Sequence, residues 1–255
     1  MRFTSLCALS ICVLLLTACN TESARTVRVA SFNAAMGMEH ADELAKALES
    51  GSDERLLKLA AIVQEVDPDI LLLNEFDYEA SVDTADLLNN LYLAEKPYPY
   101  SFSGPVNTGV QSGLDLDGDG EMGGPGDAWG YGTFPGQYGM LILSRFPIQL
   151  DKVKDYREFR WNALPRANRP VNPDGTDFYT DATWGEMRLS SKSHWDVPVD
   201  VDGVELRILA HHPTPPVFDG PEDRIVRRAG LGLHVDQVSG AAVHLYNSAA
   251  LPRQV

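Results

Sequence analysis

The chain has 255 residues, of which 44% are hydrophobic and 22% are charged, so it holds enough apolar material for one sizeable core. Its formal net charge of −15 argues against tight, non-specific binding of nucleic acid, because such binding needs Lys and Arg to neutralise phosphates. The three cysteines are Cys7, Cys12 and Cys19, so a disulfide framework is excluded for the rest of the chain.

Residues 1–18 have the pattern of a secretory signal peptide. Arg2 gives a positive start, residues 6–16 form an apolar run too short to span a bilayer, and the segment LTAC ends it at Cys19. This ending resembles the bacterial lipobox, which predicts that Cys19 becomes the lipidated first residue, followed by a polar tether over 19–26. An ordinary signal peptide or a short anchor is the alternative. We therefore expect an exported protein that a lipid holds at the bacterial cell envelope, on the periplasmic or outer-membrane face.

Apolar patterning predicts that strands and helices alternate in the first part of the chain. The segment ILLL is a continuous apolar run, which is typical of a central strand buried on both faces. The segment ERLLKLAAIVQEV has the apolar spacing of an amphipathic helix, and the Asp-Pro-Asp that follows ends it. The predicted elements are strands at 27–32 and 70–73, a helix at 54–66, and a second helix as far as residue 93, capped by Ser81 or Asp83.

The remaining chain is expected to form mostly strands. Residues 103–134 are dominated by Gly, Asp and Pro, which indicates a long loop that is functional or mobile. Asp202-Gly203 is a strong hairpin signal between two strands. The predicted strands lie at 136–148, 152–159, 186–191, 195–201 and 204–210. This order favours an α+β body in which two sheets pack face to face with helices outside.

Polar side chains follow two of the apolar runs that predict strands. Asn33 ends the first run, where its amide can donate to a phosphate oxygen or bind a metal through its carbonyl. Glu75 follows the buried run ILLL, and a carboxylate there is costly unless it is paired or bound to a metal. Oxygen ligands of this kind suit Mg²⁺ or Mn²⁺. The alternatives are a turn-forming Asn33 and a salt-bridged or solvent-facing Glu75.

A pair of histidines ends the last predicted strand. Imidazole can donate to a phosphoryl oxygen or shuttle a proton, although a histidine at a strand end often has a structural role. His211 and His212 are adjacent, so they point to opposite faces of the strand and only one of them can face a site. Pro213 and the prolines that follow it would hold the chain extended and fix that choice.

The segment DLDGDG matches the first half of a calcium-binding loop. Asp115, Asp117 and Asp119 alternate before a glycine, as ligands do around a bound cation. The glutamate that would complete such a loop is absent, and Asp127 could substitute for it. The sequence therefore leaves open a Ca²⁺ site or a solvated acidic loop.

These segments together resemble the endonuclease/exonuclease/phosphatase superfamily. The matching segments are VRVASFN, PDILLLNEFD, GQYGMLILSRFPI, MRLSSKSHWDVPV and LAHHPTPPVFDGPEDR, which are spread from residue 27 to residue 224, over most of the chain that follows the predicted signal peptide. The resemblance implies a four-layer α/β/β/α sandwich with a site at one rim, and Mg²⁺- or Mn²⁺-dependent hydrolysis of a phosphodiester or phosphomonoester. By position it implies that Asn33 and Glu75 are metal and phosphate ligands and that His212 stabilises the phosphate.

The sequence departs from the family pattern after residue 224. Family members continue with Gly-Asp-x-Asn and Ser-Asp-His segments, and neither segment occurs in residues 225–255. We therefore expect a partial domain at 27–224, followed by a divergent tail that is out of frame or replaced. A sandwich that is incomplete at its C-terminus would expose a sheet edge, and the chain would be a weak or inactive enzyme.

The leading interpretation is a monomeric, lipid-anchored member of the phosphoesterase superfamily. Its acidic charge favours a small or lipid-linked phosphate ester over a long nucleic acid. The alternative is a surface module that uses the same sandwich and binds partners through Ca²⁺ at the DLDGDG loop.

Overall fold

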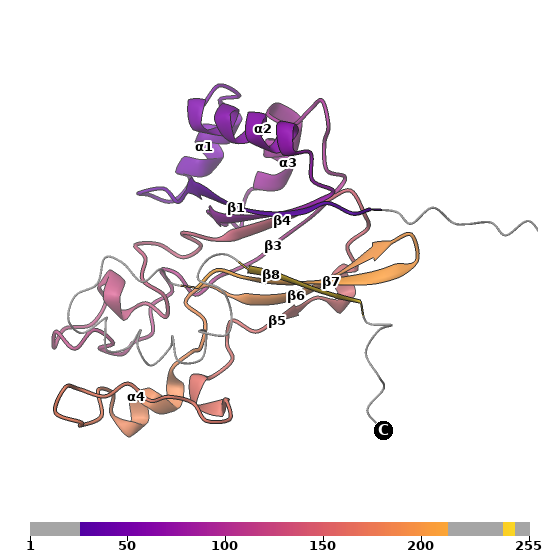
Figure 1. Cartoon of the computed structure of the whole chain (residues 1–255). Helices are drawn as coiled ribbons and strands as arrows, with labels where there is room; N and C mark the ends of the chain where they lie inside the picture. The colour runs from indigo at the N-terminus through magenta and orange to yellow at the C-terminus, as the bar shows by residue number, and fades with distance from the viewer. Residues whose placement is uncertain (1–25, 214–241, 248–255) are drawn as a thin grey trace, which may run out of the picture.

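The computed structural model describes residues 26–213 and the backbone of residues 242–247, which form two four-stranded sheets packed face to face (Figure 1). The first sheet has the order β1-β2-β4-β3, with β1 and β2 parallel and the other pairs antiparallel. The second sheet, β5-β6-β7-β8, is antiparallel throughout. The strands are β1 (Val29–Met36), β2 (Ile70–Phe76), β3 (Tyr100–Ser103), β4 (Met140–Ser144), β5 (Lys154–Asp155), β6 (His194–Val201), β7 (Val204–His211) and β8 (Ala242–Asn247).

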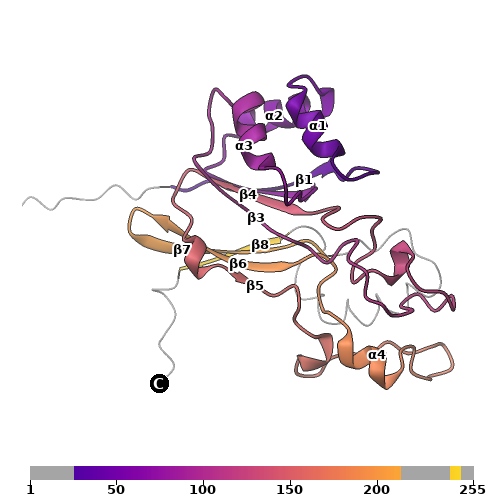
Figure 2. The ribbon, with the colours of Figure 1, turned by 180° about the vertical axis from the view of Figure 1, so that it is seen from behind.

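Three helices cover the outer face of the first sheet, as both ribbon views show (Figures 1 and 2). They are α1 (Glu43–Glu49), α2 (Glu54–Val66) and α3 (Thr84–Leu91). Side chains alternate along β2, so Leu71 and Leu73 pack against the helices while Ile70 and Leu72 face the second sheet. The run ILLL is therefore buried on both faces, as its sequence predicts.

The core between the two sheets joins alternate residues of β2 and β4 to the inner face of β6 and β7. Trp195 lies at its centre, with 2% of its surface exposed, and meets the ring of Phe102 edge to face at 4.9 Å. Val197 and Val199 are fully buried in the same cluster. Fully burying side chains of this size contributes roughly 1.5–3 kcal/mol each, so this layer fixes the second sheet against the first.

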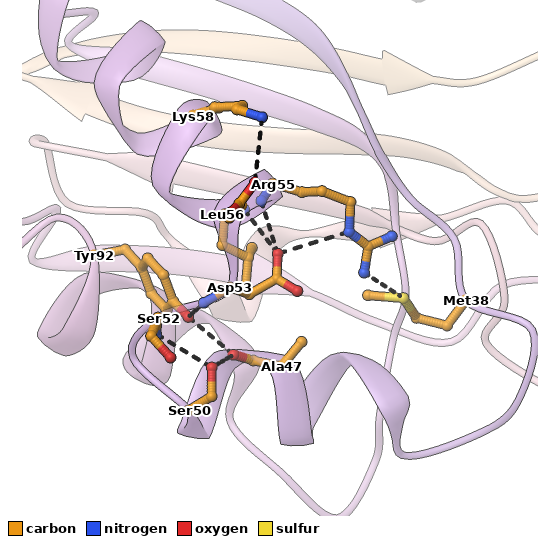
Figure 3. A network of polar contacts seen from close by, with 10 residues as sticks. Met38, Ala47, Ser50, Ser52, Asp53, Arg55, Leu56, Lys58 and Tyr92 are labelled. Atoms are coloured by element: carbon orange, nitrogen blue, oxygen red, sulfur yellow. Dashed lines mark hydrogen bonds and ion pairs between the residues drawn. The ribbon is translucent and has the colours of Figure 1, made fainter.

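Helix α2 has the predicted bounds because both of its ends are capped. The Asp53 side chain accepts hydrogen bonds from the backbone N–H groups of Arg55 and Leu56, and Asp67 ends the helix in the left-handed conformation. Figure 3 shows how this cap joins its surroundings, because Arg55 reaches the sulfur of Met38 and the Asp53 N–H donates to the Tyr92 hydroxyl. The first turn of α2 is thus tied to the loop after β1.

The hairpin between β6 and β7 confirms the turn signal in the sequence. Asp202 and Gly203 both have positive φ, at 53° and 86°, as a two-residue type I′ turn requires. Strand β8 then pairs with the other side of β7, from Leu206↔Asn247 to His211↔Ala242. A segment of the predicted tail thus extends the second sheet, and β8 is its last strand.

The α+β prediction is confirmed, but three of the four predicted layers are seen in the part of the chain that the structure describes. Helix α4 (Asp181–Glu186) packs on the 3-10 turn η3 (Trp161–Ala163), away from the second sheet (Figure 1). The predicted strand at 186–191 is wrong, because Arg188 makes a single bridge to Arg160 there. The chain turns at this point to pack into a small separate core.

That third core lies under the long loop. Leu116, Trp161, Tyr179 and Met187 are buried together in it. The long loop is confirmed, since it holds only the short 3-10 turn η1 (Pro125–Asp127) between β3 and β4. The predicted signal peptide at 1–18 and Cys19 lie outside the described residues. In the described part of the chain, no helix combines the length and the apolar character needed to cross a membrane.

Candidate active site

Three elements deliver polar side chains to one rim of the molecule. Strands β1 and β2 run parallel with Asn33 opposite Asn74, so the residue after Asn74 projects at the same edge as Asn33. Strand β7 ends at His211 in the second sheet, and His212 follows it. The structure brings His212 and Glu75 together, with 3.3 Å between His212 Nε2 and Glu75 Oε1.

Glu75 is surrounded by groups that favour its ionised form. Its hydrogen bond with His212 lowers the pKa of the carboxyl most, and a hydrogen bond with Asn33 and the charge of Lys192 lower it further. Burial opposes these effects, but the pKa remains below its ordinary value. Glu75 is therefore an anion at neutral pH, which a metal ligand must be.

The backbone at this rim is irregular in both strands. Glu75 has φ of 52° and Ala35 has φ of 50°, and neither is a glycine. The pairing of β1 with β2 slips between Asn33 and Met36, as it does at a β-bulge. Conformations of this kind cost about 1–3 kcal/mol each and occur at functional sites. Here the bulge lets the Ala35 N–H donate to Asn33 Oδ1 at 2.9 Å.

His212 presents two different nitrogen atoms. Nε2 faces the Glu75 carboxylate, so this nitrogen carries a proton and donates it to the hydrogen bond. Nδ1 is buried without a hydrogen-bond partner in the described residues. A doubly protonated ring would therefore offer Nδ1–H to a further anion while Glu75 balances its charge.

His211 has a different environment, as the alternation of the strand predicts. It is 3% exposed and stacks on His194 of the neighbouring strand, with ring centroids 5.2 Å apart. The two side chains therefore lie in different environments, and His212 is the one that contacts Glu75.

Lys192 acts on this site through its charge, and the sequence analysis did not single it out. Its residue is 7% exposed, and its charge contributes to the low pKa of Glu75. Lys192 lies in the polar segment SSKS between two apolar stretches, so neither periodicity nor a motif singles it out. The one feature that could have identified Lys192 is its position two residues before β6. The sequence alone does not show that β6 begins near the rim.

The loops beside Glu75 are held by a buried carboxylate. Asp77 is 1% exposed and accepts hydrogen bonds from the backbone N–H groups of Met38 at 2.8 Å and Tyr138 at 2.7 Å. Burial raises the pKa of Asp77 to about 6 despite these two bonds. A Cβ on Gly37 would lie 2.3 Å from the Tyr138 ring, so the loop after β1 packs directly on that ring.

The acidic loop forms a second group of possible metal ligands. Asp115, Asp117 and Asp127 each place a carboxylate oxygen within 4.8 Å of the others. Asp127 is buried and accepts hydrogen bonds from the N–H groups of Leu116 and Gly123. The predicted fourth member, Asp119, is outside this group and its side chain accepts a bond from the Glu121 N–H instead.

Crowding of like charges affects the pKa of one carboxyl in this loop. Burial raises the pKa of Asp117, and the neighbouring charges of Asp119, Asp127 and Asp115 raise it further. A bound cation would relieve this repulsion. The described residues therefore offer two places for a metal ion, the rim at Glu75 and the acidic loop.

Comparison with known proteins gives a family match and two similar solved structures. The model of the endonuclease/exonuclease/phosphatase family matches residues 30–237. An endonuclease/exonuclease/phosphatase from Beutenbergia cavernae DSM 12333 is 20% identical, with a TM-score of 0.42, over 83% of this chain and 44% of that one. A family protein from Leptotrichia buccalis C-1013-b is 10% identical, with a TM-score of 0.39, over 84% of this chain and 62% of that one.

The chain thus spans less than two thirds of the length of either of these structures. No curated protein matches it. The family match covers most of the chain and includes β1, β2 and β7, which carry Asn33 and Glu75 and lead to His212. By this match, the chain belongs to the endonuclease/exonuclease/phosphatase family.

Proposed function

We propose that the chain binds a divalent cation and a phosphate ester at the rim formed by β1, β2 and the end of β7, and that it hydrolyses the ester. Members of its family are hydrolases that act on phosphate ester bonds. The observation that carries the proposal is the contact between Glu75 and His212, which pairs an anionic oxygen ligand with an imidazole N–H donor. Both groups are needed to hold a metal and a phosphate side by side.

The residues at the rim fit a small, hard cation. Glu75 is ionised and offers carboxylate oxygens, which Mg²⁺ and Mn²⁺ prefer. Mg²⁺ is often bound through one or two protein carboxylates, with water and substrate phosphate completing its shell. A bound ion would neutralise charge that develops on the phosphoryl oxygens.

Asn33 and His212 would act on the phosphate itself. The Asn33 carbonyl accepts a hydrogen bond from the Ala35 N–H, so its amide N–H group is directed toward Glu75 and the rim. His212 Nδ1, once protonated, can donate to a phosphoryl oxygen. We propose that these two donors orient the ester and stabilise the negative charge of its transition state.

Turnover by this chain is proposed to be slow. The attacking water needs a group that accepts its proton, and such a group contributes about 10²–10⁴-fold to the rate. Glu75 is the carboxylate that contacts His212. A metal bound to Glu75 would keep this carboxylate from accepting the proton of the attacking water.

Replacing Glu75 tests the cation site without relying on turnover. We expect MgCl2 or MnCl2 to raise the unfolding temperature of the wild-type chain, because an ion that binds the folded state stabilises it. At 100 times the dissociation constant the gain is about 2.7 kcal/mol. Glu75→Gln should lose this gain and any measurable hydrolysis of a phosphate ester, as followed by thermal unfolding and phosphate release.

The matched control is Glu65→Gln on α2. Glu65 is exposed and lies on the helical layer, so its variant should keep the full response to Mg²⁺. A Glu75→Gln chain that responds to Mg²⁺ as strongly as wild type would contradict the proposal. Fast turnover that disappears in Glu75→Gln would support the site but refute slow hydrolysis.

The acidic loop supports a second candidate function, a Ca²⁺-dependent binding module on the same scaffold. The observation that favours it is the approach of three carboxylates, with Asp127 buried beneath the loop. Ca²⁺ takes six to eight oxygen ligands, which carboxylates, backbone carbonyls and water can supply together.

Replacing Asp117 distinguishes this candidate from the first. If the loop binds Ca²⁺, CaCl2 should stabilise the wild-type chain and the Glu75→Gln chain equally, and Asp117→Ala should lose that stabilisation. Asp151→Ala, at an exposed position outside the loop, is the control. Thermal unfolding with and without CaCl2 is the measurement, and equal responses in Asp117→Ala and wild type would exclude the module.

A further inference from the structure

A polar cleft lies on the helix side of the first sheet, at its edge strand β3. Along β3, Ser101 pairs with Leu143 and Ser103 pairs with Leu141. Side chains of directly paired residues lie on one face of a sheet, and both leucines belong to the core under the helices. The two serines therefore face the helical layer, in the position where the neighbouring strands carry leucines.

These small side chains leave room beneath helix α3, which covers this face of the sheet (Figure 2). The cleft has a volume of about 300 Å³, at the lower end of the range for small-molecule sites. Ser101 and Ser103 line one side, and residues 78–85, in the loop after β2 and the first turn of α3, line the other. The rim at Glu75 is a different place, because Glu75 contacts His212 at the end of the second sheet.

Two hydroxyl groups that line the cleft have no hydrogen-bond partner among the described residues. Thr84 is only 5% exposed, and its N–H donates to the Val82 carbonyl while its hydroxyl bonds to none of these residues. The Ser101 hydroxyl is likewise unbonded, whereas Ser103 donates to the Met140 carbonyl at 2.8 Å. Withdrawing a hydroxyl from water is costly unless it gains a hydrogen bond. The buried Thr84 hydroxyl therefore points to a ligand in the cleft.

The wall opposite β3 is fixed without a ligand. The Tyr78 N–H donates to the Gly136 carbonyl at 2.9 Å, and a Cβ on Gly136 would lie 2.1 Å from the Tyr78 carbonyl oxygen. Glu79 accepts a hydrogen bond from the Ala45 N–H at 3.0 Å, and Asp83 caps α3 with its side chain. A ligand would meet a wall that is already formed, which reduces the entropic cost of binding.

The charged groups of the cleft disfavour an anion. Glu79 and Asp83 line it, and no lysine or arginine is among the described residues that do so. Both carboxylates already accept backbone hydrogen bonds, and the second oxygen of Glu79 is buried. The groups that remain for a ligand are hydroxyls, each of which can donate and accept. An ammonium group offers donors only, whereas the hydroxyls of a sugar match both roles.

We propose that this cleft is an accessory binding site for a neutral, hydroxyl-rich ligand, namely one ring of a sugar. Hydroxyls of the ligand would supply the hydrogen bonds that Thr84 and Ser101 lack within the described fold. The small volume suits a single ring, and the acidic wall excludes sugar phosphates and other anions. The site is independent of the cation and phosphate site proposed above.

The test follows the backbone amide signals of the full chain by NMR while glucose, galactose, mannose or ribose is added at neutral pH. At least one of these sugars should shift the signals of Thr84 and Ser101 until they saturate. A dissociation constant of about 1 mM is expected from a few hydrogen bonds in a small cleft. Glucamine and gluconate, which are a cationic and an anionic relative of glucose, should not bind more tightly than the best neutral sugar.

Two variants show whether the hydroxyls carry the binding. Thr84→Val, which keeps the shape of the side chain, and Ser101→Ala should each lower the sugar affinity about fivefold, the effect of one lost hydrogen bond. Thr26→Val, at an exposed position before β1, is the control and should bind as wild type does. Without sugar, Thr84→Val should unfold at no lower temperature than wild type, whereas a purely structural Thr84 would lower that temperature and leave sugar binding unchanged.

Three results would overturn the proposal. They are wild-type affinity in both Thr84→Val and Ser101→Ala, the absence of a saturable shift at these residues with any of the four sugars, and binding of glucamine or gluconate alone. Glu75→Gln should bind the sugar as wild type does, so failure of the cation site at the rim would leave this test unaffected.

Discussion

At the scale of single residues, Asp77 is a buried carboxylate whose ionisation destabilises the folded chain. It is buried, follows Glu75 by two residues, and accepts backbone hydrogen bonds from Met38 and Tyr138. Its pKa is raised to about 6, so the folded chain binds this proton more tightly than the unfolded chain does. Between the ordinary pKa of 3.8 and pH 6, the free energy of unfolding therefore falls as the pH rises.

Replacing Asp77 should flatten this part of the stability profile. A shift of two pKa units corresponds to about 3 kcal/mol, so the loss of wild-type stability from pH 4 to pH 6 should include a contribution of about 2–3 kcal/mol from this residue. Asp77→Asn removes that contribution, although the amide keeps only one oxygen to accept the two backbone bonds. Urea unfolding across pH 4–7 in EDTA measures the difference.

Asp151→Asn controls for the loss of an exposed carboxylate. Carboxylates far from Asp77 titrate alike in the three chains, so the difference between the wild-type and Asp77→Asn curves reports Asp77 together with its charge coupling to Glu79 and Glu43. Identical slopes for wild type and Asp77→Asn would show that Asp77 is not a buried titrating group.

The residues of the site differ in how far the sequence predicts them. Asn33, Glu75 and His212 follow apolar runs, and strand alternation separates His211 from His212, so their meeting at one rim follows from sheet geometry. Lys192 has no such pattern, because its position depends on Asn107, which is distant in sequence. The positive φ of Glu75 is likewise set by tertiary packing and could not be predicted from the residue type.

At the scale of elements, local capping and periodicity predict well where they act within one segment. Helix α2 has its predicted bounds because Asp53 caps one end and Asp67 closes the other. The β6–β7 hairpin follows from Asp202-Gly203 in the same way.

The sequence analysis did not predict the elements that depend on partners distant in sequence. Helix α1 lies in a polar stretch and is fixed by packing on α3 and by the hydrogen bond from Ala45 N–H to Glu79. Strand β3 exists because β4 pairs with it. Residues 186–191 read as a strand, but they turn toward the small core that contains Met187.

At the scale of the whole molecule, two sheets and one helical layer place the rim where three segments meet. Strands β1 and β2 bring Asn33 and Glu75 from the first sheet, and β7 brings His212 from the second. The core around Trp195 holds the two sheets together, so it also sets the distance between Glu75 and His212. A site built in this way depends on the packing of the whole sandwich.

The most direct test of the cation and phosphate site is anomalous diffraction from crystals grown with MnCl2 and phenyl phosphate. We expect a manganese peak at about 2.1 Å from a Glu75 carboxylate oxygen, the distance for a small divalent cation. The phosphate should lie between this ion and His212. A manganese peak confined to Asp115, Asp117 and Asp127, with none at Glu75, would contradict the proposed function.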